Sequence, residues 1–380
     1  MSLVKTNAIL DASGGNTATI NSMTPTADSL QGFRNRIING DMRIDQRNAG
    51  ASVTITNTGA NTYTLDRWAA YGSVASKFSV QQNAGSVTPP VGFTNYLGCT
   101  SLSAYTVGAA EIFTLQQQIE GFNFADLNFG SANAKTVTIS FWVRSSLTGS
   151  FAGFLNNSAQ NRTYPFSYTI SAANTWEQKS VTIAGDTTGT WIGGTNGIGA
   201  GVWFSLGCGS TFQGTANAWT ASTTYGVSGQ NQVVGTNGAT FYITGVQLEV
   251  GSVATPFERR DYGRELMLCQ RYYEKSYDIS VVPGTTDGNG SHRLSGTSMD
   301  NDILSSIKFA VSKRAAPTMT GYTTDGTQGS WKYRRNGVSA TNNTINFAST
   351  GTSGTVPYLN AGAAYVAVDF FGHWVAVSEL

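Results

Sequence analysis

Aromatic side chains are the residues of this sequence best suited to recognising a ligand. The 380-residue chain contains 8 Trp, 16 Tyr and 19 Phe. Sugars present apolar C–H faces that stack on Trp or Tyr, while Asn, Gln, Asp and Arg satisfy their hydroxyls. We therefore predict sugar contacts from residues in the expected loops and in the segment SWKYRR, and core packing is the alternative for each. These residues are Trp191, Trp219, Tyr225, Trp331, Tyr333 and Arg334. Three other tryptophans lie in strand patterns and are expected in the core or on a sheet face: Trp68, Trp142 and Trp203.

Residues that could perform catalysis are sparse. The sequence has no GxSxG, HExxH or phosphate-binding P-loop motif. Its two histidines, His292 and His373, offer little for Ser-His or Cys-His chemistry. Glycoside hydrolysis needs only two carboxylates, and Glu111, Glu120 and Asp126 lie near one another in EIFTLQQQIEGFNFAD. Because nothing in the sequence places such a pair across a cleft, we predict no catalysis and keep hydrolysis as the alternative.

Two acidic residues, Asp41 and Asp45, share one face of the segment GDMRID and have the oxygen-rich neighbours Asn39 and Asn48. Calcium prefers carboxylate and amide oxygens, so a structural Ca²⁺ ion is one interpretation. Hydrogen bonding to backbone amides or arginine is the other. No other cofactor is expected. The three cysteines fit no zinc spacing and are predicted to be buried thiols: Cys99, Cys208 and Cys269.

The charge balance argues against two classes of partner. The formal net charge is +1 and only 12% of the residues are charged, so no strong field attracts nucleic acid or anionic lipid. No stretch of about 18 apolar residues predicts a membrane span. The start MSLVKTNAILDASGG lacks the pattern of a secretory signal. We expect a soluble protein without membrane insertion that is not exported by the standard route. If it works outside cells, something other than secretion must release it.

The distribution of residue types predicts an all-β chain in four parts. Residues 1–35 are rich in Ser, Thr, Asn and Gly, which favours an extended arm lying on a partner. Residues 36–257 carry alternating patterns such as TVTISFWVRSS at 136–146, which predict an antiparallel β-sandwich with long loops suited to binding. Residues 258–277 are expected to be a short helical neck. Residues 278–380 show short alternating runs again and predict a second β-sandwich.

The segment TPFERRDYGRELMLCQRYYEKSY, residues 255–277, is the long charged stretch without turn signals. Thr255 and Pro256 are expected near the start of its helix. Apolar residues recur in it at spacings of three or four and form one stripe: Tyr262, Leu266, Cys269, Tyr273 and Tyr277. Two interpretations are open. The stripe packs on its own sandwich, or three copies of the chain meet along it as a trimer.

Several segments resemble tail-fibre proteins of tailed bacteriophages and prophages. They are FRNRIINGDMRIDQRN, YTLDRW, TISFWVRSS, GDTTGTW, ITGVQLEVGSVATPFERRDYGRELMLCQRYYEKSY and the ending HWVAVSEL. The resemblance covers nearly the whole chain, and its most specific part ends in LCQRYYEKSY. It implies a central carbohydrate-binding jelly roll and a homotrimeric fibre.

The resemblance also implies a place on a virion. Residues 1–35 would attach to other tail or baseplate proteins, and the chain would bind host-surface glycans without cutting them. Assembly in the host cytoplasm and release by lysis would agree with the lack of a secretory signal. The alternatives are a structural virion component, such as a head fibre or tail-neck protein, and a polysaccharide depolymerase.

Overall fold

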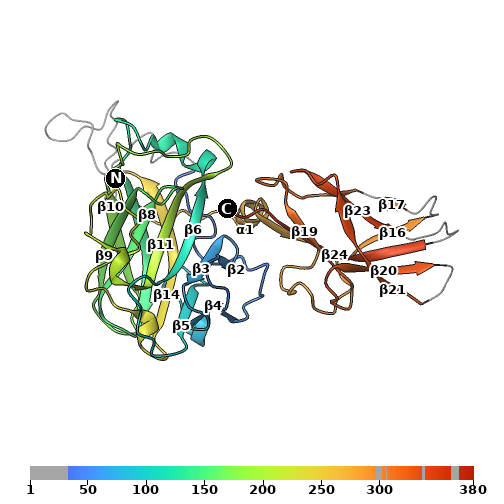
Figure 1. Ribbon diagram of the computed structural model, residues 1–380, viewed down its shortest axis with the longest axis horizontal. Helices are drawn as coiled ribbons and strands as arrows, with labels where there is room; N and C mark the ends of the chain where they lie inside the picture. The colour runs from blue at the N-terminus through green and yellow to red at the C-terminus, as the bar shows by residue number, and fades with distance from the viewer. Residues whose placement is uncertain (1–32, 297–301, 305, 336–338, 361–367) are drawn as a thin grey trace, which may run out of the picture.

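The computed structural model describes residues 33–296, 302–304, 306–335, 339–360 and 368–380. Most of the predicted arm, residues 1–32, lies outside the described residues. The described chain is nearly all β and forms two bodies arranged along the long axis, a large one and a smaller one, with the helix α1 (Tyr262–Gln270) between them (Figure 1). The all-β fold class is therefore confirmed.

The larger body is a jelly-roll sandwich of two six-stranded antiparallel sheets. In spatial order, the first sheet contains β1 (Val53–Thr54), β4 (Phe78–Gln82), β5 (Leu97–Ser101), β14 (Thr240–Val250), β7 (Val137–Ser145) and β10 (Glu177–Ile183). The second sheet contains β2 (Thr62–Leu65), β3 (Trp68–Gly72), β6 (Ile112–Glu120), β11 (Ile198–Cys208), β8 (Gly149–Asn156) and β9 (Thr163–Ile170).

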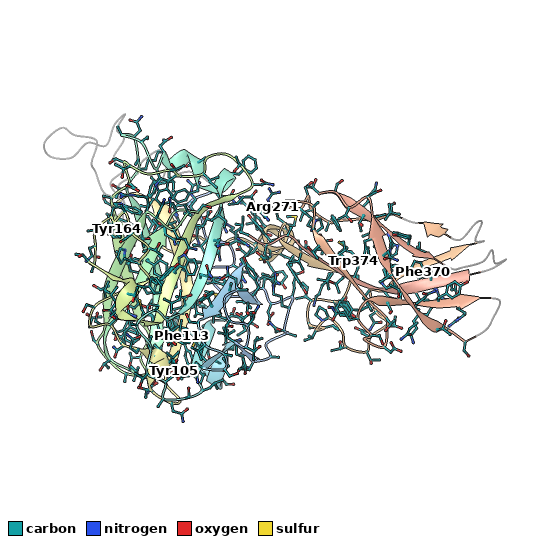
Figure 2. The ribbon with its side chains drawn as sticks, in the orientation of Figure 1. Tyr105, Phe113, Tyr164, Arg271, Phe370 and Trp374 are labelled. Carbon is teal, nitrogen blue, oxygen red and sulfur yellow. The ribbon has the colours of Figure 1, made fainter. Side chains whose placement is uncertain are left out.

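Alternation along these strands separates core from surface. In β7, Phe141 belongs to the core between the sheets, while its neighbour Trp142 lies on the outer face. In β11, Phe204 packs in the same core and Trp203 points outward. Figure 2 shows Phe113 of β6 within this larger body. The strand patterns predicted from the sequence are confirmed here.

The smaller body is organised around one long strand, β24 (Val368–Val377). Four strands pair with β24: β15 (Tyr273–Lys275), β16 (His292–Gly296), β19 (Thr318–Tyr322) and β20 (Ser330–Arg335). β21 (Thr341–Thr344) extends this sheet from β20. A second sheet forms on β23 (Gly354–Asn360) from β17 (Asp302–Leu304), β18 (Ile307–Lys308) and β22 (Asn346–Ala348). The small core of this body includes Phe370 and Trp374, which Figure 2 labels.

The helix α1 is much shorter than the predicted range 258–277. Asp261 caps its N-terminus by accepting a hydrogen bond from the backbone N–H of Arg264 at 2.9 Å, so the cap expected at Thr255 is wrong. The helix ends at Gln270 because the next residues pair with β24, Tyr273 lying opposite Val377. This pairing overrides the helical pattern of the sequence. Within the described part of the chain, no helix is long and apolar enough to cross a membrane.

The predicted oligomerisation stripe is largely buried inside its own chain. Cys269 packs in a small cluster with Ile38 and Tyr272, and Leu266 contacts the same cluster. Tyr273 is buried on β15, and Tyr277 stacks on His373 with ring centroids 3.7 Å apart. Only Tyr262 is exposed, at 45%. A trimer interface along these five residues is therefore wrong, because the stripe already packs against its own subunit.

A buried polar network fixes the junction between the two bodies. Arg271 donates to the carboxylate of Glu120 at 2.9 Å from Nε and 2.6 Å from Nη2, and the hydroxyl of Tyr272 donates to it at 2.6 Å. Figure 2 shows Arg271 at this junction. A second ion pair joins Arg67 to Glu379. Burial raises the pKa of Glu120, but its hydrogen bonds outweigh burial and hold that pKa below its ordinary value of 4.5.

We predict that Glu120→Gln lowers the free energy of unfolding at pH 7 by about 1.5–3 kcal/mol, because it weakens charge-assisted hydrogen bonds. Because the pKa of Glu120 is depressed in the folded state, its stabilising charge is present above the ordinary value of 4.5 and is lost as the pH falls below that value. The difference between variant and wild type should therefore shrink at low pH. Urea unfolding at pH 7 and at acidic pH measures both effects, and an equal difference at both would contradict this assignment.

Candidate functional site

A pocket of about 330 Å³ lies on the outer face of the second sheet. Its volume is at the lower end of the range typical of small-molecule sites. Strands supply its floor, and loops supply two of its sides. It is lined by Gly59, Ala60, Asn61, Tyr71, Ile112, Gln118, Gln160, Trp203 and Tyr225. The lining therefore combines three aromatic side chains with three amides and contains no charged residue.

Strand register places the floor of this pocket. Trp203 of β11 lies opposite Gln116 of β6 on one side and Phe154 of β8 on the other. Its indole stacks on Phe154, with ring centroids 5.1 Å apart and an interplanar angle of 18°. The indole lies over Gly201, where an added Cβ would come within 2.4 Å of its Nε1. A glycine two residues before Trp203 is thus what lets the ring lie flat on the sheet.

Three amide groups beside Trp203 each have one buried atom without a hydrogen-bond partner among the described residues. The Oε1 atoms of Gln116 and Gln118 are buried and unpaired, as is Nδ2 of Asn156. The other ends of two of these amides are engaged: Gln116 donates to Asn61, and Asn156 accepts from Trp203 Nε1 at 2.9 Å. A buried polar atom without a partner costs about 1–3 kcal/mol. Such atoms mark this face as suited to a ligand that brings both donors and acceptors.

The loop from residue 213 to residue 232 places Tyr225 over Trp203. Its backbone is held to the edge strand β9 by reciprocal hydrogen bonds between Thr220 and Thr163 at 2.9 and 3.1 Å. The hydroxyl of Tyr225 donates to Oε1 of Gln160 at 2.5 Å. Burial and the nearby phenol of Tyr71 raise the pKa of Tyr225, so the hydroxyl stays neutral and can donate or accept.

A second hollow of about 640 Å³ continues on the same face, where this loop borders β8 and β9. Serine and threonine dominate its lining, including Ser150 and Ser167 from the two strands and Thr220, Ser222 and Thr224 from the loop. The aromatic pocket and this hydroxyl-lined hollow therefore both lie on the outer face of the second sheet.

The loop aromatics predicted to contact sugar divide between two places. Tyr225 lines the pocket, but Trp191 and Trp219 form a separate half-buried pair with ring centroids 5.6 Å apart at 88°. The indole of Trp191 donates to Asp186 at 3.1 Å, and that of Trp219 donates to the backbone oxygen of Ala184 at 2.7 Å. Both pack against the sandwich core. Trp203, expected either in the core or on a sheet face, supplies the floor of the pocket, and sequence reasoning did not assign it to the site.

The three predicted contacts in the smaller body do not form a binding surface. Trp331 is fully buried and donates to the backbone oxygen of His373 at 2.7 Å, while Tyr333 is 7% exposed in the same core. Arg334 is exposed and lies 3.8 Å from Asp369. Sugar contact at Trp331 and Tyr333 is therefore wrong, because alternation on β20 directs both side chains inward.

The predicted calcium ligands have protein partners instead. Asp41 pairs with Arg43 at 2.5 Å. Asp45 accepts hydrogen bonds from the backbone N–H groups of Arg47, Asn48 and Gly50 at 3.1, 2.9 and 2.7 Å. Among the residues that the structure describes, no group of three His, Cys, Asp or Glu side chains is placed to hold a metal ion. The calcium site stays a prediction that these contacts do not support.

The carboxylates considered for hydrolysis are also engaged. Glu111 accepts from the hydroxyl of Tyr105 at 2.9 Å and from the backbone of Gly108 at 2.8 Å. Asp126 forms two hydrogen bonds with Arg36 at 3.0 and 2.7 Å, and Glu120 belongs to the junction network. None of these three acids lines the aromatic pocket.

Comparison with known proteins gives distant structural similarity. No protein-family model and no curated protein matches the chain. An enzymatically active domain of tailspike protein 4 from bacteriophage CBA120 matches with 11% identity and a TM-score of 0.30, over 58% of this chain and 22% of its own. The chain thus spans about a fifth of that domain.

Carbohydrate-binding modules match over most of their own length. A CBM22-1 xylan-binding domain from Paenibacillus barcinonensis has 11% identity and a TM-score of 0.26, covering 55% of this chain and 99% of its own. A family 11 module from Clostridium thermocellum, in complex with a β-1,3-1,4-mixed-linked tetrasaccharide, has 10% identity and a TM-score of 0.25. The match covers 53% of this chain and 97% of that module. These low TM-scores carry no information about the ligand of this chain.

We predict that Gly201→Ala displaces the indole of Trp203, because the new Cβ would lie 2.4 Å from Nε1 and 2.6 Å from Asn156 Oδ1. The expected loss of stability is about 1–3 kcal/mol, as in other overpacked sites. Gly193→Ala is the matched control, since nothing lies within 4 Å of its added Cβ. Tryptophan emission and thermal unfolding measure the change. If the Gly201 and Gly193 variants gave identical spectra, Gly201 would not be what positions the indole of Trp203.

Proposed function

We propose that this protein binds neutral glycans in the aromatic pocket on the outer face of the second sheet. The observation that carries the proposal is the unpaired buried Oε1 of Gln118 in the lining of this pocket, with further unpaired amide atoms of Gln116 and Asn156 beside the ring of Trp203. A sugar ring would contact Tyr71 and Tyr225 through its C–H groups and offer a hydroxyl to the amide of Gln118. The absence of charge in the lining favours a neutral sugar over an ionic one.

The pocket is also ready to bind without large rearrangement. Phe154 supports one face of the Trp203 ring, and Gln160 holds the hydroxyl of Tyr225. Side chains that are already held in place lose little conformational freedom when a ligand arrives. A single site of this size would still bind a short glycan weakly, so useful adhesion would require several sites acting together.

We propose further that the chain is a bacteriophage tail fibre, on the basis of the sequence segments that resemble that family. Residues 1–35 would attach it to other virion proteins, three copies would form the fibre, and the pocket would bind host-surface glycans without cutting them. The trimer depends on the resemblance alone, since the stripe on and after α1 is buried within its chain. Assembly in the host cytoplasm and release by lysis belong to the same proposal.

Two other functions follow from different observations. A structural virion component would explain the polar network between the two bodies without requiring a ligand. A depolymerase would need two carboxylates on one sugar-binding surface, whereas Glu111, Glu120 and Asp126 are engaged by protein groups away from the aromatic pocket. We therefore propose a binding role without catalysis.

We predict that Tyr225→Ala weakens glycan binding about tenfold or more, because it removes a stacking surface of about 1 kcal/mol together with its buried contact area. Gln118→Ala should weaken binding about two- to tenfold through one lost hydrogen bond. Tyr262→Ala, at a 45% exposed position on α1, is the control and should bind as wild type. A neutral-glycan array followed by calorimetry on the best ligand measures all three.

Two results would overturn the glycan proposal. One is a folded wild-type protein that retains no neutral glycan on the array. The other is retention that the Tyr225 and Gln118 variants leave unchanged, since the ligand would then lie elsewhere. Release of oligosaccharides from host polysaccharide would instead establish the depolymerase.

We predict a mass of three chains for the full-length protein by light scattering at micromolar concentration. Tyr262→Ala and Leu266→Ala should leave that mass unchanged, because the buried stripe is not the interface between copies. A mass of 40.2 kDa, that of one chain, would contradict the trimer.

A further inference from the structure

A second pocket, of about 170 Å³, lies on the outer face of the first sheet, on the opposite side of the same sandwich. Three aromatic side chains line it, Phe93, Trp142 and Phe257, together with the cation of Arg259. Ser140 and Gln178 from the neighbouring strands complete the polar part of its lining. Its volume lies below the range typical of small-molecule sites, so it could cover only part of a ligand. Its charge distinguishes it from the neutral pocket on the second sheet.

The backbone is shaped to bring the aromatic rings together. The pairing of β14 with β7 shifts register between Thr244 and Gln247, which marks a β-bulge. Gly245 lies in this bulge with a φ of 61°, and an added Cβ would approach Phe93 to 2.6 Å and Trp142 to 3.2 Å. Only glycine therefore lets both rings close over the strand.

Arg259 is positioned by the same aromatic rings. Its guanidinium carbon lies 4.8 Å from the ring centroid of Phe93 and 5.9 Å from that of Phe257, and these two rings pack edge to face at 5.3 Å. An added Cβ at Gly92 would lie 2.8 Å from Nη2 of Arg259. The guanidinium therefore lies over the ring of Phe93 and near that of Phe257, and the missing side chain of Gly92 leaves room for it.

No hydrogen bond or ion pair engages Arg259 within the described residues. Burial raises the pKa of Asp41, and the charges of Arg43 and Arg259 oppose that rise, but the ion pair of Asp41 is with Arg43, at 2.5 Å. Arg259 is exposed to solvent, so its charge costs little in the free protein. A guanidinium without a protein acceptor can bind a carboxylate through two parallel hydrogen bonds.

We infer that this pocket binds a sugar that carries a carboxylate, such as a uronic acid. The carboxylate would pair with Arg259, the apolar face of the ring would lie on Trp142, and Ser140 and Gln178 would take hydroxyls. The inference goes beyond the proposed neutral-glycan site and does not depend on it. The two pockets would let one sandwich contact neutral and acidic sugars on opposite faces.

Titration of the full-length protein with sodium glucuronate, against methyl β-glucoside and sodium acetate, tests the inference by saturation-transfer NMR. Glucuronate should bind saturably and more tightly than either comparison compound. Arg259→Gln should weaken that binding about tenfold to a hundredfold, since a charged hydrogen-bonded pair is lost. Arg259→Lys should recover part of the affinity because it keeps the charge without the planar fork.

Arg144→Gln is the matched control. Arg144 lies on the same sheet face and over the ring of Tyr242, at 5.6 Å, but it lies outside the pocket. Arg144→Gln should change the affinity for glucuronate less than twofold. Tyr225→Ala should leave glucuronate binding intact, and this result would separate the pocket from the neutral site. Unchanged affinity in Arg259→Gln, equal binding of acetate or methyl glucoside, or loss of glucuronate binding in Tyr225→Ala would each overturn the inference.

Discussion

Alternation of side chains along a strand is the constraint on which the whole sandwich depends. Each strand must bury one row of side chains between the sheets, so the other row is available for the surface. In β11 this places Phe204 in the core and Trp203 on the outer face, one residue apart. Any slip of register by one residue would exchange the two and destroy core and pocket together.

Loops turn the two outer faces into pockets of different chemistry. On the second sheet, the loop that carries Tyr225 covers Trp203 and leaves neutral amides in the lining. On the first sheet, Phe257 and Arg259 follow β14 and, with Phe93, close over a bulge. The junction network around Glu120 and Arg271 then holds the smaller body against one end of the sandwich.

Local pattern predicted the strands, because alternation is visible in the sequence, but it left Trp203 either in the core or on a sheet face. The length of the helix was overestimated, because residues such as Tyr273 pair with β24, a strand far away in the chain. Trp331 was assigned to a ligand although it fills a core, because a short strand does not show which face is covered. Gln116 lies opposite Trp203 because of the register between β6 and β11, two strands far apart in the chain, and the sequence does not show this register.

The most direct test of the central claim is a crystal structure of the full-length protein with the oligosaccharide that binds best on the neutral-glycan array. The account predicts a sugar ring against Tyr71 and Tyr225, with hydroxyls within hydrogen-bonding distance of the side-chain amides of Gln116 or Gln118. A bound sugar located only at Trp191 and Trp219, or only on the smaller body, with the pocket above Trp203 still filled by water, would contradict it.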